Sequence, residues 1–186
     1  MRSSLPRQAR SKPNYYAGVV TWTLRPATTA DIRPIAALIE PLVESRVLLG
    51  KDLVVLYESV QEFVVALDER GTVVGCGALH VFWENLGEIR TLTVSPDFQN
   101  KKVGHQLVVE LESQARALGL TTLFCLTFEV DFFLAHGFQL HSDNLVDPEV
   151  YAELVRSPDE GVAEFLDLAR VKPNTLGNSR LVKILK

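Results

Sequence analysis

The feature that most constrains this chain is the run EIRTLTVSPDFQNKKVG at residues 88–104. Its first part reads as a strand from Glu88 to Val94. A Ser-Pro-Asp turn follows, then a short polar and basic loop, and a long amphipathic helix begins near Val103. A loop rich in backbone N–H groups between a strand and a helix N-terminus is typical of anion-binding sites, because the helix dipole favours negative charge there. The segment therefore predicts a site for a phosphate-bearing ligand.

Composition narrows the class of protein. The 186 residues are 47% hydrophobic and 23% charged, which is ordinary for a soluble globular chain that can bury a core. The net charge of -4 argues against a nucleic-acid partner, since such proteins usually carry a basic excess. No apolar run approaches the roughly 18 residues needed to cross a membrane. The two cysteines, Cys76 and Cys125, lie far apart in apolar runs. We therefore expect buried reduced thiols, no membrane partner and a cytoplasmic location.

The chain divides into a tail and a domain. Residues 1–20 are basic, contain Pro, Ser and Gly, and show no hydrophobic period, which predicts a flexible N-terminal tail. A basic arm that contacts ligand phosphates or a partner is the alternative. Residues 21–186 are expected to form a single domain.

Periodicity and turn signals predict both helices and strands in this domain. We expect helices from Thr28 onward and in residues 54–60, 103–118 and 131–136. We expect strands at residues 21–25, 63–68, 73–81, 88–94, 121–127, 138–140 and 181–185, with a turn at 85–87. Residues 142–173 are expected to be mixed and partly helical. This order indicates an α/β or α+β class without specifying the fold.

Two motifs resemble those of the GNAT N-acetyltransferases. The loop resembles the family's acetyl-CoA signature, in which Gln or Arg is followed by two residues, Gly, one residue, and Gly or Ala. Gln99 and Gly104 match this signature, and Lys102 stands where the first Gly is expected. The run FFLAHGF at 132–138 resembles a later motif, with Phe133 in place of a Tyr. The resemblance implies a single mixed, mostly antiparallel sheet flanked by helices, with splayed central strands.

The resemblance also implies an acetyl-CoA site. Main-chain groups of the strand before the loop would bind the pantetheine arm, the loop and helix start would bind the phosphates, and Phe133 would pack beside the arm. The expected contacts are Leu92, Thr93, Val94, Gln99, Asn100, Lys101, Lys102, Val103, Gly104, His105 and Phe133. In many members the Tyr protonates the departing thiolate; with Phe here, water would do so. Lys102 would either support binding through its charge or weaken it by crowding the phosphate.

Acetyl transfer to an amine needs a base for the amine proton and a donor for the oxyanion. Glu88 is the candidate base, directly or through water, and the N–H near Leu92 or Thr93 is the candidate oxyanion donor. The alternative for Glu88 is a surface ion pair with Arg90. A period of two places Glu88, Arg90, Leu92 and Val94 on one face of the strand.

The acceptor is suggested by a finer resemblance. Two runs, residues 47–66 followed by GCGALH and LGEIRTLTV, and VKPNTLGNSRLVKIL near the C-terminus, are similar to the acetyltransferase domain of N-acetylglutamate synthases. The short bacterial amino-acid N-acetyltransferases that lack a kinase domain are especially similar. This implies acetylation of the α-amino group of L-glutamate or L-glutamine, the first step of arginine biosynthesis. The residues expected to bind the acceptor are Lys51, Arg90, Asn178, Ser179 and Arg180, each cation having a plain surface charge as its alternative.

Other functions stay open at this point. The acceptor could be a protein N-terminus, a polyamine or an antibiotic amine, or the chain could be a non-catalytic acyl-CoA sensor. The histidines are scattered singly, so no metal is expected. A homodimer is an option, because dimers are common among such domains.

Overall fold

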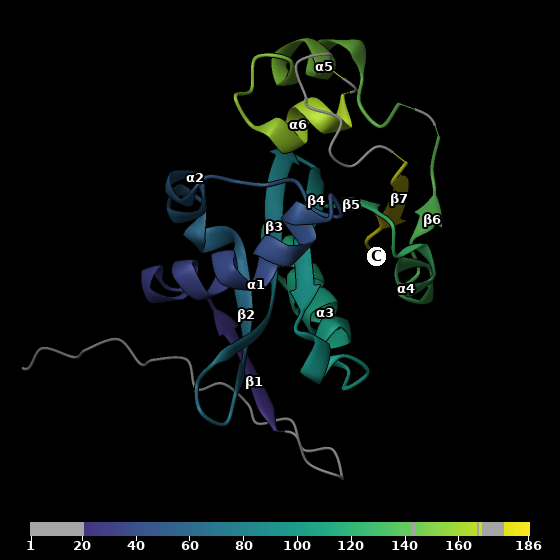
Figure 1. Cartoon of the computed structure of the whole chain (residues 1–186). Coiled ribbons are helices and arrows are strands. Elements are labelled where there is room, and N and C mark those ends of the chain that lie inside the picture. The colour runs from purple at the N-terminus through teal and green to yellow at the C-terminus, as the bar shows by residue number, and fades with distance from the viewer. Residues whose placement is uncertain (1–20, 143, 167, 169–176) are drawn as a thin grey trace, which may run out of the picture.

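The computed structural model describes residues 21–142, 144–166, 168 and 177–186 (Figure 1). The expected N-terminal tail lies outside these residues. The strands are β1 (Trp22–Pro26), β2 (Phe63–Asp68), β3 (Val73–Trp83), β4 (Leu86–Val94), β5 (Thr122–Thr127), β6 (Gln139–Leu140) and β7 (Ser179–Ile184). The α-helices are α1 (Ile32–Glu44), α2 (Leu53–Glu58), α3 (Val103–Ala117), α4 (Val130–Ala135), α5 (Pro148–Leu154) and α6 (Glu160–Phe165). Short 3-10 turns are η1 (Thr29–Asp31), η2 (Val60–Glu62) and η3 (Pro96–Phe98).

The described strands form one seven-stranded sheet in the order β1-β2-β3-β4-β5-β7-β6. Every neighbouring pair is antiparallel except β4 and β5, which are parallel. The prediction of a mixed, mostly antiparallel sheet flanked by helices is therefore confirmed.

The central strands β4 and β5 separate soon after they meet. Their pairing runs from Leu86–Thr122 to Glu88–Phe124 and stops there. Both strands continue, β4 to Val94 and β5 to Thr127. The splay expected from the resemblance is present, and Glu88 stands at the last pair before the strands part.

A β-bulge interrupts β4 beyond this point. Cys76 of β3 pairs with Thr93 of β4, and Ala78 pairs with Arg90. Between these two pairs, Gly77 of β3 faces two residues of β4, Thr91 and Leu92. Thr91 has a φ of 55°, in the left-handed region that a β-branched residue rarely adopts. The extra residue of a bulge leaves a backbone group outside the ladder and re-aims the side chains that follow.

The bulge overturns one sequence expectation. Glu88 and Arg90 lie on the sheet face of α1, since Ala78, the pair of Arg90, packs in the cluster under α1. Leu92 and Val94 instead pack against the core under α3, on the opposite face. The prediction that all four share a face is wrong, because the period of two holds only along an uninterrupted ladder.

A second correction concerns the turn before β4. Leu86 and Gly87 belong to the strand, and both pair with β5. A Cβ at Gly87 would lie 2.7 Å from Cδ1 of Leu120. The glycine is therefore needed for close packing rather than for a turn.

Three hydrophobic clusters hold the helices. One lies under α3 and includes Leu107 and Leu111, and one lies under α1 and α2 and includes Ile35. The third joins α5 and α6 to β3, β5 and β7. Helices α5 and α6 consequently sit together beyond the end of β3 (Figure 1), the partly helical excursion expected for 142–173 as far as it is described. No helix among the described residues is long and apolar enough to cross a membrane.

Candidate active site

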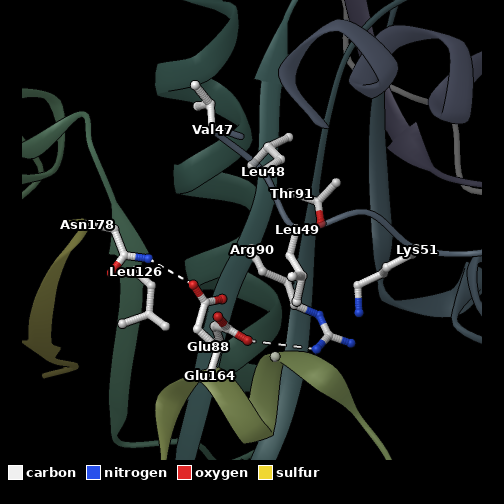
Figure 2. Close-up of a pocket in the computed structure, with 11 residues that line it drawn as sticks. Val47, Leu48, Leu49, Lys51, Glu88, Arg90, Thr91, Leu126, Glu164 and Asn178 are labelled. Carbon is white, nitrogen blue, oxygen red and sulfur yellow. Dashed lines mark hydrogen bonds and ion pairs between the residues drawn. The ribbon is translucent and has the colours of Figure 1, made fainter. Parts of the chain in front are cut away.

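A pocket opens beside the splay of β4 and β5, on the face that carries α1 (Figure 2). Residues from the α1–α2 loop, β4, β5, α6 and the start of β7 surround it. They are Val47, Leu48, Leu49, Lys51, Glu88, Arg90, Thr91, Leu126, Gly161, Glu164 and Asn178. The pocket thus gathers the candidate base and three of the five residues expected to bind the acceptor.

Glu88 is the most perturbed group in the pocket. The residue is 5% exposed, and its Oε2 has no hydrogen-bond partner among the described residues. The nearest cation, Nη1 of Arg90, is 3.8 Å from that oxygen. Burial raises the pKa of Glu88 to about 7, although Arg90, His80 and Lys51 act in the opposite direction. A carboxylate titrating near neutral pH is suited to accept a proton and release it again.

Arg90 is held by carboxylates on two sides. Its Nη2 donates to Oε2 of Glu62 at 2.9 Å, and its Nη1 donates to Oδ1 of Asp159 at 3.0 Å. Glu62 also contacts Nδ1 of His80 at 2.8 Å. The Arg90 side chain is 9% exposed, so it is not a plain surface charge. The guanidinium instead joins η2, β4 and the start of α6.

Lys51 enters the pocket from the α1–α2 loop (Figure 2), and its Nζ lies 3.4 Å from Oδ2 of Asp159. Asn178, just before β7, donates from Nδ2 to Oε1 of Glu164 at 3.1 Å. Both residues therefore already have partners at the pocket wall.

Ser179 and Arg180 do not line the pocket. Nη2 of Arg180 donates to the Phe165 carbonyl at 2.6 Å, and its guanidinium lies over the Phe165 ring. The structure therefore brings Lys51, Arg90 and Asn178 together and places this arginine against α6.

Sequence reasoning missed the contribution of α6. Neither Asp159 nor Glu164 was among the residues that the sequence indicated for the site. The Asp159 side chain is only 16% exposed, accepts from the Val162 backbone N–H at 3.0 Å and pairs with both Arg90 and Lys51. The sequence could indicate Asp159 as a helix N-cap, but it could not show its pairing with Arg90 and Lys51, which are distant in sequence.

The anion-binding loop lies at the other end of β4. Asn100 and Lys102 have φ values of 59° and 62°, and Lys102 is the N-cap of α3. The first N–H groups of a helix have no partner within it, so those of Val103, Gly104 and His105 are available to an anion. A Cβ at Gly104 would be 3.5 Å from both Val94 and Phe132, which leaves the helix start close to β4 and α4.

Other loop residues have definite surroundings. Nζ of Lys101 donates to the Asp97 carbonyl at 2.6 Å, and the His105 ring lies 4.1 Å from that of His136. Phe133 is buried in the core under α3, with its ring 5.2 Å from those of Phe132 and Phe138. The neighbouring Phe132, not Phe133, is the ring beside the helix start.

Strand β4 therefore connects two kinds of chemistry. One end leads into a loop and helix start that suit phosphates, and the other presents a buried carboxylate with a pKa near 7 at the edge of a pocket. The unpaired edges of β4 and β5 lie between the anion-binding loop and the pocket. An extended ligand arm with amide groups can hydrogen-bond to such edges and so reach from the loop to the pocket. Such an arrangement is suited to an acyltransferase whose acyl donor carries phosphate and amide groups.

Comparison with known proteins gives the family. Residues 36–138 match the model of the acetyltransferase (GNAT) family, and the chain belongs to this family. The amino-acid acetyltransferase of Mycobacterium tuberculosis is 51% identical over 164 residues, covering 87% of this chain and 94% of that protein. That of Neisseria meningitidis is 37% identical over 124 residues, covering 66% of this chain but 28% of the longer relative.

Solved structures give the same picture. Rv2747 from Mycobacterium tuberculosis, in complex with CoA and NLQ, aligns with a TM-score of 0.83 at 50% identity, over 88% of this chain and 99% of that one. N-acetylglutamate synthase from Neisseria gonorrhoeae, complexed with coenzyme A and N-acetyl-glutamate, aligns with a TM-score of 0.71 at 29% identity. That alignment covers 89% of this chain and 35% of the synthase chain.

Proposed function

We propose that this protein is an amino-acid N-acetyltransferase that moves the acetyl group of acetyl-CoA to the α-amino group of L-glutamate or L-glutamine, the first step of arginine biosynthesis. The observation that carries the proposal is the buried Glu88 carboxylate, with a pKa of about 7, in a pocket that also presents Lys51 and Arg90. The relative named an amino-acid acetyltransferase, 51% identical over most of the chain, supports the reaction class. The synthase complex with N-acetyl-glutamate supports the kind of acceptor.

Acetyl-CoA is the proposed donor. Residues Gln99 to His105 would receive its phosphates at the start of α3, with Lys101 and Lys102 adding positive charge. The main chain of Leu92, Thr93 and Val94 would bind the pantetheine amides along the unpaired part of β4. The neighbours bound to CoA support this donor.

The proposed transfer is direct. Ionised Glu88 takes a proton from the acceptor's ammonium, itself or through a water, and the neutral amine attacks the thioester carbonyl. The backbone N–H of Leu92 at the bulge stabilises the oxyanion of the tetrahedral intermediate. Collapse of this intermediate breaks the C–S bond and releases the CoA thiolate. The attacking nitrogen loses its second proton, which passes through water to the thiolate, so that the products are the neutral amide and the CoA thiol. Cys76 and Cys125 are unsuited to a covalent route, because burial raises the pKa of the Cys76 thiol to about 12 and that of Cys125 still further.

The acceptor's carboxylate would be recognised mainly by Lys51, whose ammonium enters the pocket. Arg90 adds positive potential although its Nη atoms are shared with Glu62 and Asp159. On the β7 side, Asn178 lines the pocket and would contact the acceptor directly. Ser179 and Arg180 lie outside the lining, and Arg180 would support this wall through its contacts with Phe165 of α6.

The conformation of Lys102 supports a second candidate function. Lys102 adopts a left-handed conformation at a position where the family signature has Gly. If this side chain shifts the bound donor away from the geometry that transfer needs, the protein is a sensor that binds acyl-CoA without turnover.

The test is acetyl-CoA-dependent release of CoA thiol from the purified protein, with the twenty amino acids supplied singly and Glu88→Gln as the matched control. Turnover confined to glutamate or glutamine, and lost in the control variant, supports the proposal. A parallel assay supplies a polyamine, an aminoglycoside and a short peptide, and turnover with one of these but with no amino acid points to another acceptor. Acetyl-CoA binding by calorimetry without turnover identifies a sensor.

The proposal extends to the setting of the protein. A cytoplasmic location agrees with the two buried, unpaired cysteines, since reducing compartments keep thiols free. We also propose that residues 21–186 form a single domain and that the protein is a homodimer. Limited proteolysis tests the single domain, and sedimentation of the full chain tests the homodimer.

A further inference from the structure

The acceptor pocket has a wall that lies outside the family's common region. The family model ends at residue 138, and α6 begins at Glu160. The helix is firmly packed, since Val162, Phe165 and Leu166 are buried with residues of β3 and β5. The Phe165 ring lies 4.6 Å from that of Phe124. This wall is therefore a fixed part of the pocket rather than a loose cover.

Asp159, the N-cap of α6, contacts both cations of the pocket from behind. Its Oδ1 and Oδ2 lie 3.0 and 3.1 Å from Nη1 of Arg90, and Oδ2 lies 3.4 Å from Nζ of Lys51. Burial alone would raise the pKa of Asp159, but Arg90, Lys51 and the Val162 N–H bring it to about 2. The carboxylate is consequently ionised at neutral pH. Asp159 does not line the pocket itself.

The positive charges of the pocket are already offset by carboxylates before any acceptor arrives. Among the described residues, the pocket is lined by two cations, Lys51 and Arg90. Two ionised carboxylates behind them, Glu62 and Asp159, offset this charge. Glu88 and Glu164 add further acidic groups at the wall. An acceptor that brings a second carboxylate therefore meets cations whose field is already largely cancelled.

We propose that Asp159 is a specificity-determining residue that limits how much negative charge an acceptor can carry into the pocket. The inference rests on the proposed function and concerns the same site. Asp159 acts through the cations it neutralises, so removing its charge strengthens their attraction for a second carboxylate on the acceptor.

Glutamate and glutamine make a sensitive pair of probes. They share the α-amino and α-carboxylate groups and differ by one charge at the end of the side chain. Any general loosening of Lys51 and Arg90 would affect both acceptors alike, through the shared α-carboxylate. A change in the ratio of their kcat/KM values therefore isolates the effect of charge.

The test uses Asp159→Asn, because Asn caps a helix about as well as Asp and so preserves the bond from Val162 N–H. Asp159→Ser is a second capping variant in case the first is unstable. Glu153→Gln on α5 is the matched control, since it removes an exposed carboxylate that pairs only with Arg156 in the described structure. Both Asp159 variants are expected to raise the ratio of kcat/KM for glutamate over glutamine by about tenfold. The control is expected to leave this ratio unchanged.

The outcomes separate two kinds of failure. An unchanged ratio in folded Asp159 variants, or an equal loss with both acceptors, overturns the inference and assigns Asp159 a purely structural role. If wild-type protein turns over neither amino acid, the proposed function fails instead. The charge effect is then read from calorimetric Kd values of the two amino acids for the CoA-loaded protein. An unchanged Kd ratio, or no binding of either, also overturns it.

Discussion

Gly161 and Arg90 approach each other so closely that even a methyl group on Gly161 would require a neighbouring side chain to shift. A Cβ at Gly161 would lie 3.3 Å from Nη1 of Arg90 and 3.0 Å from Oδ1 of Asp159. The backbone of α6 thus touches the ion pair that orders the pocket. The pair and the helix have to move together if either is displaced.

Gly161→Ala is therefore expected to disturb the acceptor site selectively. The added methyl group would push Asp159 or Arg90 outward by a few tenths of an ångström, a displacement that catalytic sites tolerate poorly. We expect kcat/KM for the acceptor to fall by about tenfold or more. The Kd for CoA should stay the same because the loop at α3 is remote. An equal loss of CoA binding would show that the change is global.

Glu88 predicts the pH dependence of the reaction. The groups that face it are Arg90 on β4, His80 on β3, Asp159 before α6 and Lys51 in the α1–α2 loop. Since the base must be ionised, kcat/KM should rise with pH through about 7. Glu88→Gln should lower kcat by about 10²- to 10⁴-fold and abolish the rise of kcat/KM with pH. If the rise of kcat/KM with pH persisted in this variant, the titrating group would be a residue other than Glu88.

The same carboxyl group should make the protein less stable as pH rises. Its pKa is about 7 when folded against 4.5 as the ordinary value, so the folded state holds the proton more tightly. Stability is fully present below about 4.5 and is lost as pH rises through 7, by about 3 kcal/mol at most. Glu88→Gln should remove this loss. Urea unfolding of both proteins at pH 5 and pH 8 measures the difference, and parallel pH dependences would contradict it.

Lys102 should be a strained position. At φ 62° a side chain is disfavoured and Gly is not, so Lys102→Gly should raise the free energy of unfolding by about 1 kcal/mol. Lys101 has no positive φ and serves as the matched control. Lys101→Gly should lower the free energy of unfolding. Lys102→Met keeps the strain and removes the charge. A weaker CoA affinity in this variant would show that the lysine supports phosphate binding.

Phe133 occupies the family's tyrosine position without the setting for an acid. Its ring is 4% exposed in the core, so Phe133→Tyr should bury a hydroxyl and destabilise the fold by about 1–3 kcal/mol. We expect no gain in kcat. Phe132→Tyr, at a half-buried ring beside Gly104, should be better tolerated. A faster enzyme with Tyr at 133 would mean that the hydroxyl reaches the thiolate.

Much of the fold could be predicted from local signals. The strand over 63–68 and the helix start at 103 agree with the structure because hydrophobic periods and turn residues act over short distances. The bulge at Thr91 could not be predicted, since nothing in EIRTLTV marks the extra residue. The error it caused was the assignment of Leu92 to the same face as Glu88.

The site was predictable to a different extent. Glu88, Lys51 and Asn178 meet at the pocket as expected, because a strand and flanking loops carry them there. Asp159 was missed because its role depends on cations 69 and 108 residues away in sequence. Pairings at such separation are set by tertiary packing, which a single sequence does not display.

The early end of the β4–β5 ladder has a consequence for folding as well as for chemistry. The unpaired edges of a sheet normally belong to its two outermost strands. This sheet has an additional unpaired edge in its interior, where β4 continues beyond Glu88 without pairing with β5. A guest with spaced amide groups can complete that edge as a missing strand would. The donor that we propose would then serve as part of the architecture. Saturation with CoA alone should slow amide exchange along residues 89–94, before any acceptor is present.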